Sequence, residues 1–343
     1  MTRKNIFGKT LIELKEIVQE LNLKTFNASQ IAEWIYKKRV YSFDEMTNLS
    51  KETRDKLNEK YEILIKMPVK VSLSEDSTKK YLFQASANKY IESAYIPDND
   101  RHTLCVSSQV GCKMGCVFCA TGKMGFQGQL STAEIINQIV AIPESEMLTN
   151  IVYMGMGEPL DNLSNVLKSL QIMCSDWGFV WSARRITVST IGIIPAMKTF
   201  IENTQCHLAV SLHSPFESER AELMPVQSRY SLKDVVAVIK NYDFGRQRRV
   251  SFEYIVFEGL NDSSKHISGL ASLLNGMRCR INLIRFHEIP GSKWKSPDED
   301  KMKWFNTQLN KKGITTTIRA SRGQDIEAAC GLLATNDYRG GIS

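Results

Sequence analysis

The sequence has no long apolar segment and few cysteines. None of its apolar runs approaches the length of a membrane span, and residues 1–5 lack the apolar core of a secretory signal. The 343 residues include eight cysteines, which in a reducing compartment do not form a disulfide framework. We therefore expect a cytoplasmic protein with no membrane partner.

A strong excess of one charge is also missing. Lys and Arg total 44 against 37 Asp and Glu, a formal net charge of +7. This balance allows a polyanionic partner without establishing one, because a solvated basic surface is at least as common. With 43% hydrophobic and 24% charged residues, the chain has the composition of a globular protein. Its length is enough for one large domain and a small accessory one.

Three of the cysteines, Cys112, Cys116 and Cys119, are concentrated in one C-x3-C-x2-C segment. Structural zinc usually takes four protein ligands in two pairs, and no second pair follows here. A [4Fe–4S] cluster held by three thiolates leaves its fourth iron open. The amino and carboxylate groups of S-adenosylmethionine can chelate that iron, so the spacing favours a cluster of this kind, with structural zinc as the alternative.

The first 65 residues have the pattern of short helices. Apolar residues recur at helical spacing over 9–22, Asn27 can cap a second helix, and Ser50 a third that ends near residue 60. The second helix ends in the basic run Lys37-Lys38-Arg39. Residues 1–65 are therefore expected to form a helical RNA-binding accessory domain. Alternatively, the basic run only complements the negative end of a helix dipole.

The pattern changes to period two over residues 66–100. Runs at 69–73, 81–84 and 90–96 alternate and are separated by turn-prone links, which predicts a linking β meander. Glu92 shares a face of the last run with apolar residues. A carboxylate in that place is either exposed at a rim or held for acid–base chemistry.

Strand-like and helical runs alternate from about residue 101 to 336. Strands are expected at 103–107, 150–154, 186–190, 207–211, 250–257 and 280–286, with helices beginning near Ser131, Asn162, Ile194, Ser231 and Ser263. Repeated units of this length predict an α/β fold with a parallel sheet closed partly or wholly into a barrel. Active sites of such barrels lie at the C-terminal ends of the strands, and the three-cysteine loop follows the first strand.

Glycines and polar residues follow the next three strands. Gly155 to Leu160 is a glycine-rich strand end in which Glu158 offers an acceptor for an ammonium group. Ser189 ends the third strand, and Ser211-Leu212-His213 ends the fourth. Each motif alone is more often a turn than a ligand contact. Together, on successive strand ends beneath the cysteine loop, they indicate one cofactor cleft.

These motifs together resemble one family, the dual-specificity RNA adenine-C2 methyltransferases of the RlmN type, in the radical S-adenosylmethionine superfamily. The resemblance covers about residues 8–336 and is carried by residues 103–109, the cysteine loop, Gly155 to Leu160, Ser211-Leu212-His213 and residues 322–331. It implies a partial (β/α)6 barrel over 101–336, behind the helical domain (1–65) and the meander (66–100), with a tail over 337–343.

The resemblance also implies roles for two further cysteines. Cys330 takes a methyl group from one S-adenosylmethionine. A radical made from a second one, at a [4Fe–4S] cluster on Cys112, Cys116 and Cys119, removes hydrogen from that methyl group, and the resulting carbon radical adds to the base. Cys105 then resolves the protein–RNA adduct through a transient disulfide with Cys330. Glu92 is the expected base for the C2 proton.

Further residues correspond to the family's contacts with S-adenosylmethionine. These are Gly157, Glu158, Pro159, Ser189, Ser211, Leu212, His213 and His287. His287 stands where better-known members carry asparagine. A neutral imidazole can still donate or accept one hydrogen bond there.

The implied substrates are adenosines of 23S ribosomal RNA, in the peptidyl transferase centre, and of the transfer RNA anticodon loop. A monomer is expected, with an electron donor such as flavodoxin. RNA contacts are expected at residues 37–39, 184–185 and 246–249. The alternatives are the sister enzymes that methylate adenine C8, and a non-catalytic RNA-binding protein with a structural metal. Pro159 and residues 320–325 favour C2, whereas residues 191–195 and 211–215 recur in C8 enzymes.

Overall fold

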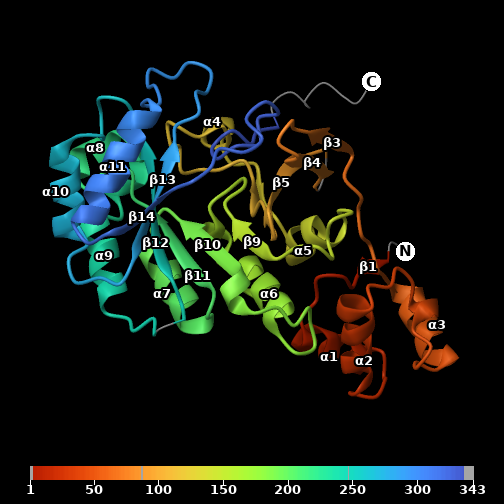
Figure 1. The fold of residues 1–343 in the computed structure, drawn as a ribbon. Helices are drawn as coiled ribbons and strands as arrows, with labels where there is room; N and C mark the ends of the chain where they lie inside the picture. The colour runs from red at the N-terminus through yellow and green to blue at the C-terminus, as the bar shows by residue number, and fades with distance from the viewer. Residues whose placement is uncertain (1–2, 86–87, 246, 336–343) are drawn as a thin grey trace.

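One mixed sheet of ten strands forms the centre of the molecule (Figure 1). The computed structural model describes residues 3–85, 88–245 and 247–335, so Arg246 and the tail expected over 337–343 lie outside the described residues. The sheet has the order β14-β13-β12-β11-β10-β9-β6-β5-β4-β3. From β6 to β14 all neighbours are parallel, and from β3 to β6 all are antiparallel.

The parallel strands agree with the expected ones to within about two residues. They are β6 (Arg101–Cys105), β9 (Asn150–Tyr153), β10 (Ile186–Thr190), β11 (His207–Ser211), β12 (Val250–Val256), β13 (Arg280–Arg285) and β14 (Thr315–Ile318). β14 and β3 are the two edges of the sheet, so its parallel part is open. The expectation of a partial α/β barrel is confirmed, and β14 extends its six strands by one.

The three meander strands join this sheet directly. β3 (Lys70–Leu73), β4 (Lys79–Gln84) and β5 (Tyr90–Asp98) form antiparallel pairs, and β5 pairs in turn with β6. Two small two-stranded sheets complete the strands: β1 (Lys4–Asn5) with β2 (Tyr61–Glu62), and β7 (Gln109–Val110) with β8 (Gly128–Gln129).

Helices follow the parallel strands, as expected from the alternating pattern. They are α4 (Ala120–Met124), α5 (Thr132–Val140), α6 (Leu163–Cys174), α7 (Ile194–Asn203), α8 (Glu217–Leu223), α9 (Leu232–Lys240), α10 (Ser264–Leu273) and α11 (Glu299–Lys311). Ser131, near which a helix was expected to begin, forms a capping box with Glu134, and Ser231 caps α9. Both hydroxyls accept otherwise unpaired N–H groups of the first helical turn, which sets where the helix begins.

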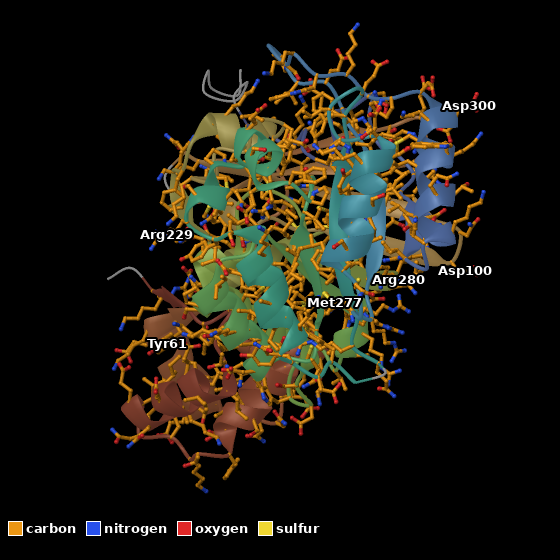
Figure 2. The ribbon with its side chains drawn as sticks, turned by 90° about the vertical axis from the view of Figure 1, so that its left-hand side faces the viewer. Tyr61, Asp100, Arg229, Met277, Arg280 and Asp300 are labelled. Carbon is orange, nitrogen blue, oxygen red and sulfur yellow. The ribbon has the colours of Figure 1, made fainter. Side chains whose placement is uncertain are left out.

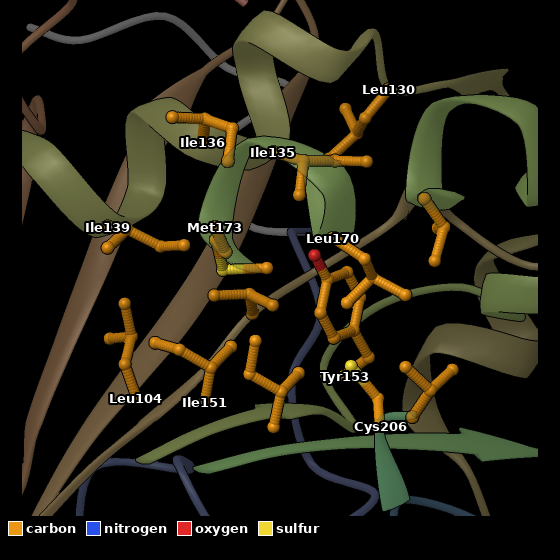
Figure 3. Close-up of a cluster of buried hydrophobic side chains, with 14 of the residues drawn as sticks. Leu104, Leu130, Ile135, Ile136, Ile139, Ile151, Tyr153, Leu170, Met173 and Cys206 are labelled. Atoms are coloured by element: carbon orange, nitrogen blue, oxygen red, sulfur yellow. The ribbon is translucent and has the colours of Figure 1, made fainter. Parts of the chain in front are cut away.

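Side chains along each strand point alternately to the hydrophobic core and to the inside of the open barrel. Leu104, Ile151 and Tyr153 point outward and pack against α5 and α6 (Figure 3). Their strand neighbours Thr103 and Val152 line a cavity instead. Because successive side chains point to opposite faces of a sheet, one set of residues on each strand packs against the helices and the alternate set lines the cavity.

The N-terminal part is helical, with α1 (Leu11–Glu20), α2 (Asn27–Ala32), a π-helical turn (Glu33–Lys37), a 3-10 turn (Phe43–Glu45) and α3 (Lys51–Lys60). The predicted Ser50 cap is confirmed, because its side chain accepts from the N–H of Thr53. The predicted Asn27 cap is wrong: Asn27 is the first residue of α2, and its amide donates to Gln30 at 2.8 Å instead of capping the helix.

Aromatic packing fastens this helical part to the barrel. Tyr36 is 1% exposed and contacts the rings of Trp177 and Phe179, which follow α6. Tyr61 of β2 is labelled in the red N-terminal part of the ribbon in Figure 2.

Within the residues that the structure describes, no helix has the length and apolar character needed to cross a lipid bilayer.

Candidate functional site

A cavity of about 630 Å³ occupies the inside of the open barrel. At the C-terminal ends of the strands it is lined by Cys105, Cys119, Met154, His287 and Cys330. At the N-terminal ends of the strands it is lined by Arg101, Arg184, His207, Arg249 and Arg280. The cavity therefore joins the thiols to a strongly basic opening.

The three-cysteine loop lies at the C-terminal end, with Cys112 and Cys116 each 9% exposed and Cys119 half-buried. Burial raises the pKa of the Cys112 thiol to about 12 and that of the Cys116 thiol well above its usual value. A negative charge on Cys119 adds to both increases. Free thiols in this place resist ionisation, whereas a bound cation would favour the thiolates.

The backbone of the cysteine loop has two features that are compatible with a bound cluster: a tight turn at Gly111 and N–H groups near the thiols. Gly111 has φ 68°, and a Cβ on it would lie 1.8 Å from the carbonyl oxygen of Gly125. Backbone N–H groups of Met114 and of Thr121 and Gly122 favour the thiolates of Cys112 and Cys119, respectively. Such N–H groups stabilise cluster thiolates. Among the described residues no group of three or more Cys, His, Asp or Glu side chains stands in a metal-binding arrangement. The three thiols would have to move closer together to hold a cluster.

The glycine-rich strand end lies beside this loop. Gly157 has φ 97°, and a Cβ there would come within 2.5 Å of Gln109 Cβ, so only glycine fits. The side-chain oxygen of Gln109 accepts from the N–H of Glu158 at 2.8 Å. The Glu158 carboxylate accepts from the N–H groups of Leu160 and Ile191 at 3.0 and 2.9 Å. Burial raises the pKa of Glu158 to about 7, while these N–H groups lower it.

The remaining cofactor candidates follow in strand order. Pro159 begins a 3-10 turn (Pro159–Asn162), Ser189 lies on β10 opposite Ala209, and Ser211 ends β11 opposite Glu253. Leu212 is fully buried. The buried Arg220 guanidinium donates to the Ser211 carbonyl at 3.1 Å, which fixes this strand end. None of these four side chains lines the cavity, so their predicted contacts with S-adenosylmethionine stay a prediction.

The two candidate histidines stand in different surroundings. His213 is 3% exposed, accepts from the N–H of Ile255 at 3.0 Å, and packs edge-on against Phe118 of the cysteine loop at 4.8 Å. Burial lowers the pKa of His213 to about 3, so the ring is neutral and supports the loop from behind. His287 lines the cavity, and burial and the charge of Arg285 lower its pKa, so it too is neutral.

Cys105 and Cys330 meet in the cavity. Cys330 is exposed to it, and Ala328 of the same segment packs against Cys105 and Ala94. Burial raises the pKa of Cys105 to about 12, and a thiolate at Cys330 adds to the increase. Burial also raises the pKa of Cys330. The Arg319 guanidinium lowers the pKa of both thiols and hydrogen-bonds Cys330.

Arg319 lines the cavity but was not singled out in the sequence analysis. Its Nη2 lies 3.4 Å from the Glu253 carboxylate, and its Nη1 lies 3.3 Å from the Met154 sulfur. Arg319 directly follows β14, and a basic residue at a strand end was the available signal, because the C-terminal ends of barrel strands face the active site. Periodicity alone does not show which strand-end side chains turn inward.

Glu92 is buried, which excludes the exposed-rim interpretation. It is 1% exposed, pairs with Lys80 at 3.1 Å, and accepts from the N–H of Ala334 at 3.0 Å. Burial raises its pKa, and Lys80 and the Ala334 N–H lower it. Glu92 thus lies under the segment that carries Cys330 and does not line the cavity.

Some of the basic residues expected to bind RNA have structural contacts. Arg39 donates to the Ser145 hydroxyl at 2.8 Å, a hydrogen bond that joins the helical part to the barrel. Arg248 donates to the carbonyls of Ile201 and Cys206, where it closes the end of α7. Arg184 and Arg249 differ, since they line the basic opening and have no ion pair within the described residues.

Comparisons with known proteins agree with this geometry. Residues 4–63 match the ribosomal RNA large subunit methyltransferase N-terminal domain, and residues 106–270 match the radical SAM superfamily. The chain is 53% identical over 335 residues to a probable dual-specificity RNA methyltransferase RlmN of Bacteroides thetaiotaomicron, covering 98% of this chain and 97% of the relative. It is 43% identical to the dual-specificity RNA methyltransferase RlmN of Syntrophus aciditrophicus, over 97% of each chain.

A solved structure extends the likeness to the whole fold. The radical SAM methyltransferase from Sphaerobacter thermophilus superposes with a TM-score of 0.88 at 38% identity, covering 96% of this chain and 99% of the other. Proteins of the radical SAM superfamily use a [4Fe–4S] cluster and S-adenosylmethionine. The chain belongs to the RlmN family of dual-specificity RNA methyltransferases, with a radical S-adenosylmethionine barrel behind its N-terminal domain.

Proposed function

We propose that this protein methylates C2 of adenosine in 23S ribosomal RNA and in transfer RNA through a methylated cysteine. The observation that carries the proposal is the meeting of Cys105, Cys330 and Arg319 in one cavity beside the cysteine loop. A binding protein with a structural metal needs neither thiol, nor a cavity at the strand ends.

Each group in or beside the cavity has a role that its surroundings support. Cys112, Cys116 and Cys119 would hold the cluster, and Glu158 would accept from the ammonium group of S-adenosylmethionine. When bound, the cluster and S-adenosylmethionine supply the one-electron chemistry that activates the methyl group. Two S-adenosylmethionine molecules are used per turnover, one of them to methylate Cys330.

The thiols then exchange partners. Cys330 carries the methyl group as a thioether; that carbon loses one hydrogen atom and bonds to C2 of the base, and C2 then gives up its proton and one electron, the electron passing to the electron-transfer partner. The Cys105 thiolate attacks the Cys330 sulfur, the electron pair of the bond between that sulfur and the methylene carbon passes to the carbon, the carbon takes up a proton to become the methyl group, and a Cys105–Cys330 disulfide forms as the product leaves. Arg319 favours the Cys105 thiolate that this attack requires. Glu92 is the proposed acceptor of the C2 proton.

The basic opening supports RNA as the substrate. Burial lowers the pKa of Arg101, and the charges of Arg319 and Arg249 lower it further, whereas Asp98 opposes the decrease. Like charges gathered at one opening destabilise the folded protein, and a bound anion relieves their repulsion. A phosphate backbone at this opening would place one extruded base in the cavity.

C2 is favoured over C8 by Pro159 and by residues 320–325, although the cysteines are shared by both reactions. We propose further that the protein is a cytoplasmic monomer and that a flavodoxin-like protein supplies electrons. Anaerobically reconstituted enzyme, incubated with RNA, is expected to produce 2-methyladenosine, detected by mass spectrometry of the digested nucleosides against both standards. A preponderance of 8-methyladenosine would identify the sister activity instead, and no methylated adenosine would refute the proposal.

A further inference from the structure

A buried ion pair of the meander lies beneath the segment that carries Cys330. Lys80 of β4 is opposite Ala94 of β5, so Glu92, two residues before Ala94, is its diagonal neighbour on the same face. The Lys80 Nζ lies 3.1 Å from Glu92 Oε1. The two side chains are only 10% and 1% exposed.

Burial of such a pair is costly unless geometry and hydrogen bonds compensate it. The Glu92 carboxylate has one further donor, the Ala334 N–H at 3.0 Å. The charged groups that act on it are Lys80 from β4 and Glu327 from the C-terminal segment, and they act in opposite directions. Burial favours the neutral acid at Glu92, and the charge of Lys80 is the largest influence that opposes it.

The pair is also tied to the segment of the methyl-carrying cysteine. The Ala334 N–H joins Glu92 to this segment, and the Gly331 carbonyl accepts from the N–H of Ala120, next to Cys119. The carboxylate, Cys330 and the cysteine loop are thus linked by one short stretch of backbone.

The neighbouring lysine shows what a purely structural pair looks like on the same strand. Lys79 points to the other face of β4 and bonds Glu144 at 2.6 Å, with Tyr81 as a second donor to that carboxylate. Its side chain is 34% exposed.

We propose that Lys80 is a positioning residue, which holds Glu92 ionised and fixed so that it accepts the substrate proton. The inference rests on the proposed function and names a residue that acts through Glu92. Glu92 becomes a neutral acid when it takes the proton.

The test is the pH dependence of a single turnover, with enzyme already methylated at Cys330 and an excess of RNA. In the Lys80→Met variant the acid limb of the rate profile should move to higher pH by one unit or more, a loss of about tenfold per unit at a fixed lower pH. Lys80→Arg keeps the charge and should retain the wild-type limb. Lys79→Met, the matched control, should also retain it.

Methylation of Cys330 itself needs no RNA and should proceed normally in all three variants, as intact-protein mass spectrometry can verify. If Lys80→Met is not folded, Lys80→Gln, which keeps a hydrogen-bond donor without the charge, must show the displaced limb. The inference would be wrong if Lys80→Met or Lys80→Gln kept the acid limb of the wild-type rate profile, or if Lys79→Met displaced that limb equally. Either result would leave the proposed function standing. A wild-type enzyme that methylates Cys330 and never modifies RNA would overturn the proposed function as well.

Discussion

Cys105 and Cys330 line the same cavity, and the Arg319 guanidinium acts on both sulfurs. One thiol ends β6 at the start of the barrel, and the other lies beyond β14, the last strand. The parallel order of the sheet does not bring them together by itself. The C-terminal segment folds back, and Ala328 packs against Cys105.

The first prediction concerns this pair. Cys330→Ala should lose methyl transfer by on the order of 10³-fold or more, without trapping RNA, because the methyl acceptor is gone. Cys105→Ala should accumulate protein covalently joined to RNA, because the adduct forms and is not released. The measurement is a denaturing gel with labelled RNA. Cys279→Ala, a half-buried thiol outside the cavity, is the control, and normal turnover by Cys105→Ala would contradict the relay.

The second prediction concerns the cysteine loop. Alanine at Cys112, Cys116 and Cys119 together should reduce the iron content from about four per chain to near zero and abolish the broad visible absorbance. Anaerobic reconstitution followed by iron and sulfide analysis measures this. Cys174→Ala should keep its iron. Retention of iron by the triple variant, or zinc in the wild type, would show that the loop holds something else.

The third prediction concerns the basic opening. Arg184→Gln, Arg249→Gln and Arg280→Gln should each weaken RNA binding. Each should also lower the slope of log affinity against log salt by about 0.7 to 0.9 per lost phosphate contact. The control is Lys233→Gln on α9, whose side chain is 74% exposed and pairs with Glu217. If the slope of log affinity against log salt were unchanged in all three variants, RNA would bind to another surface of the protein.

The fourth prediction concerns His207, which accepts from the N–H of Arg249 at 2.9 Å. Burial, and then the charges of Arg249, Arg248 and Arg184, lower the pKa of His207 to about 4. In the unfolded chain the ring takes up its proton near pH 6.5. The unfolded state therefore binds more protons between pH 6.5 and 4, and stability is lost as the pH falls through this window.

The wild type should lose roughly 2 kcal/mol of its unfolding free energy from this group between pH 7 and 5. Denaturant unfolding at each pH measures the loss. His207→Gln should be less stable at pH 7 but should show a smaller decline over that window, with His102→Gln as the control. An identical decline in wild type and His207→Gln would mean that another group carries the pH dependence.

Local patterns were sufficient for much of this fold. Ser50 and Ser131 mark helix starts because a hydroxyl that accepts a first-turn N–H needs no tertiary partner. The six strand runs were predicted to within about two residues from their apolar character alone. Asn27 shows the limit of such reasoning, because its side-chain amide donates to the Gln30 side chain and does not accept from a backbone N–H as a helix cap would.

What the sequence alone determined about this protein is the chemistry that it can perform. The spacing of Cys112, Cys116 and Cys119, and the residues around Cys330, indicated the cofactors and the family without any structure. Only the tertiary structure decided which groups meet: Arg319 with both thiols, Lys80 with Glu92, and the arginines at one opening of the barrel. Spacing along the chain sets local ligands and caps, whereas contacts between distant segments depend on the pairing and curvature of the whole sheet.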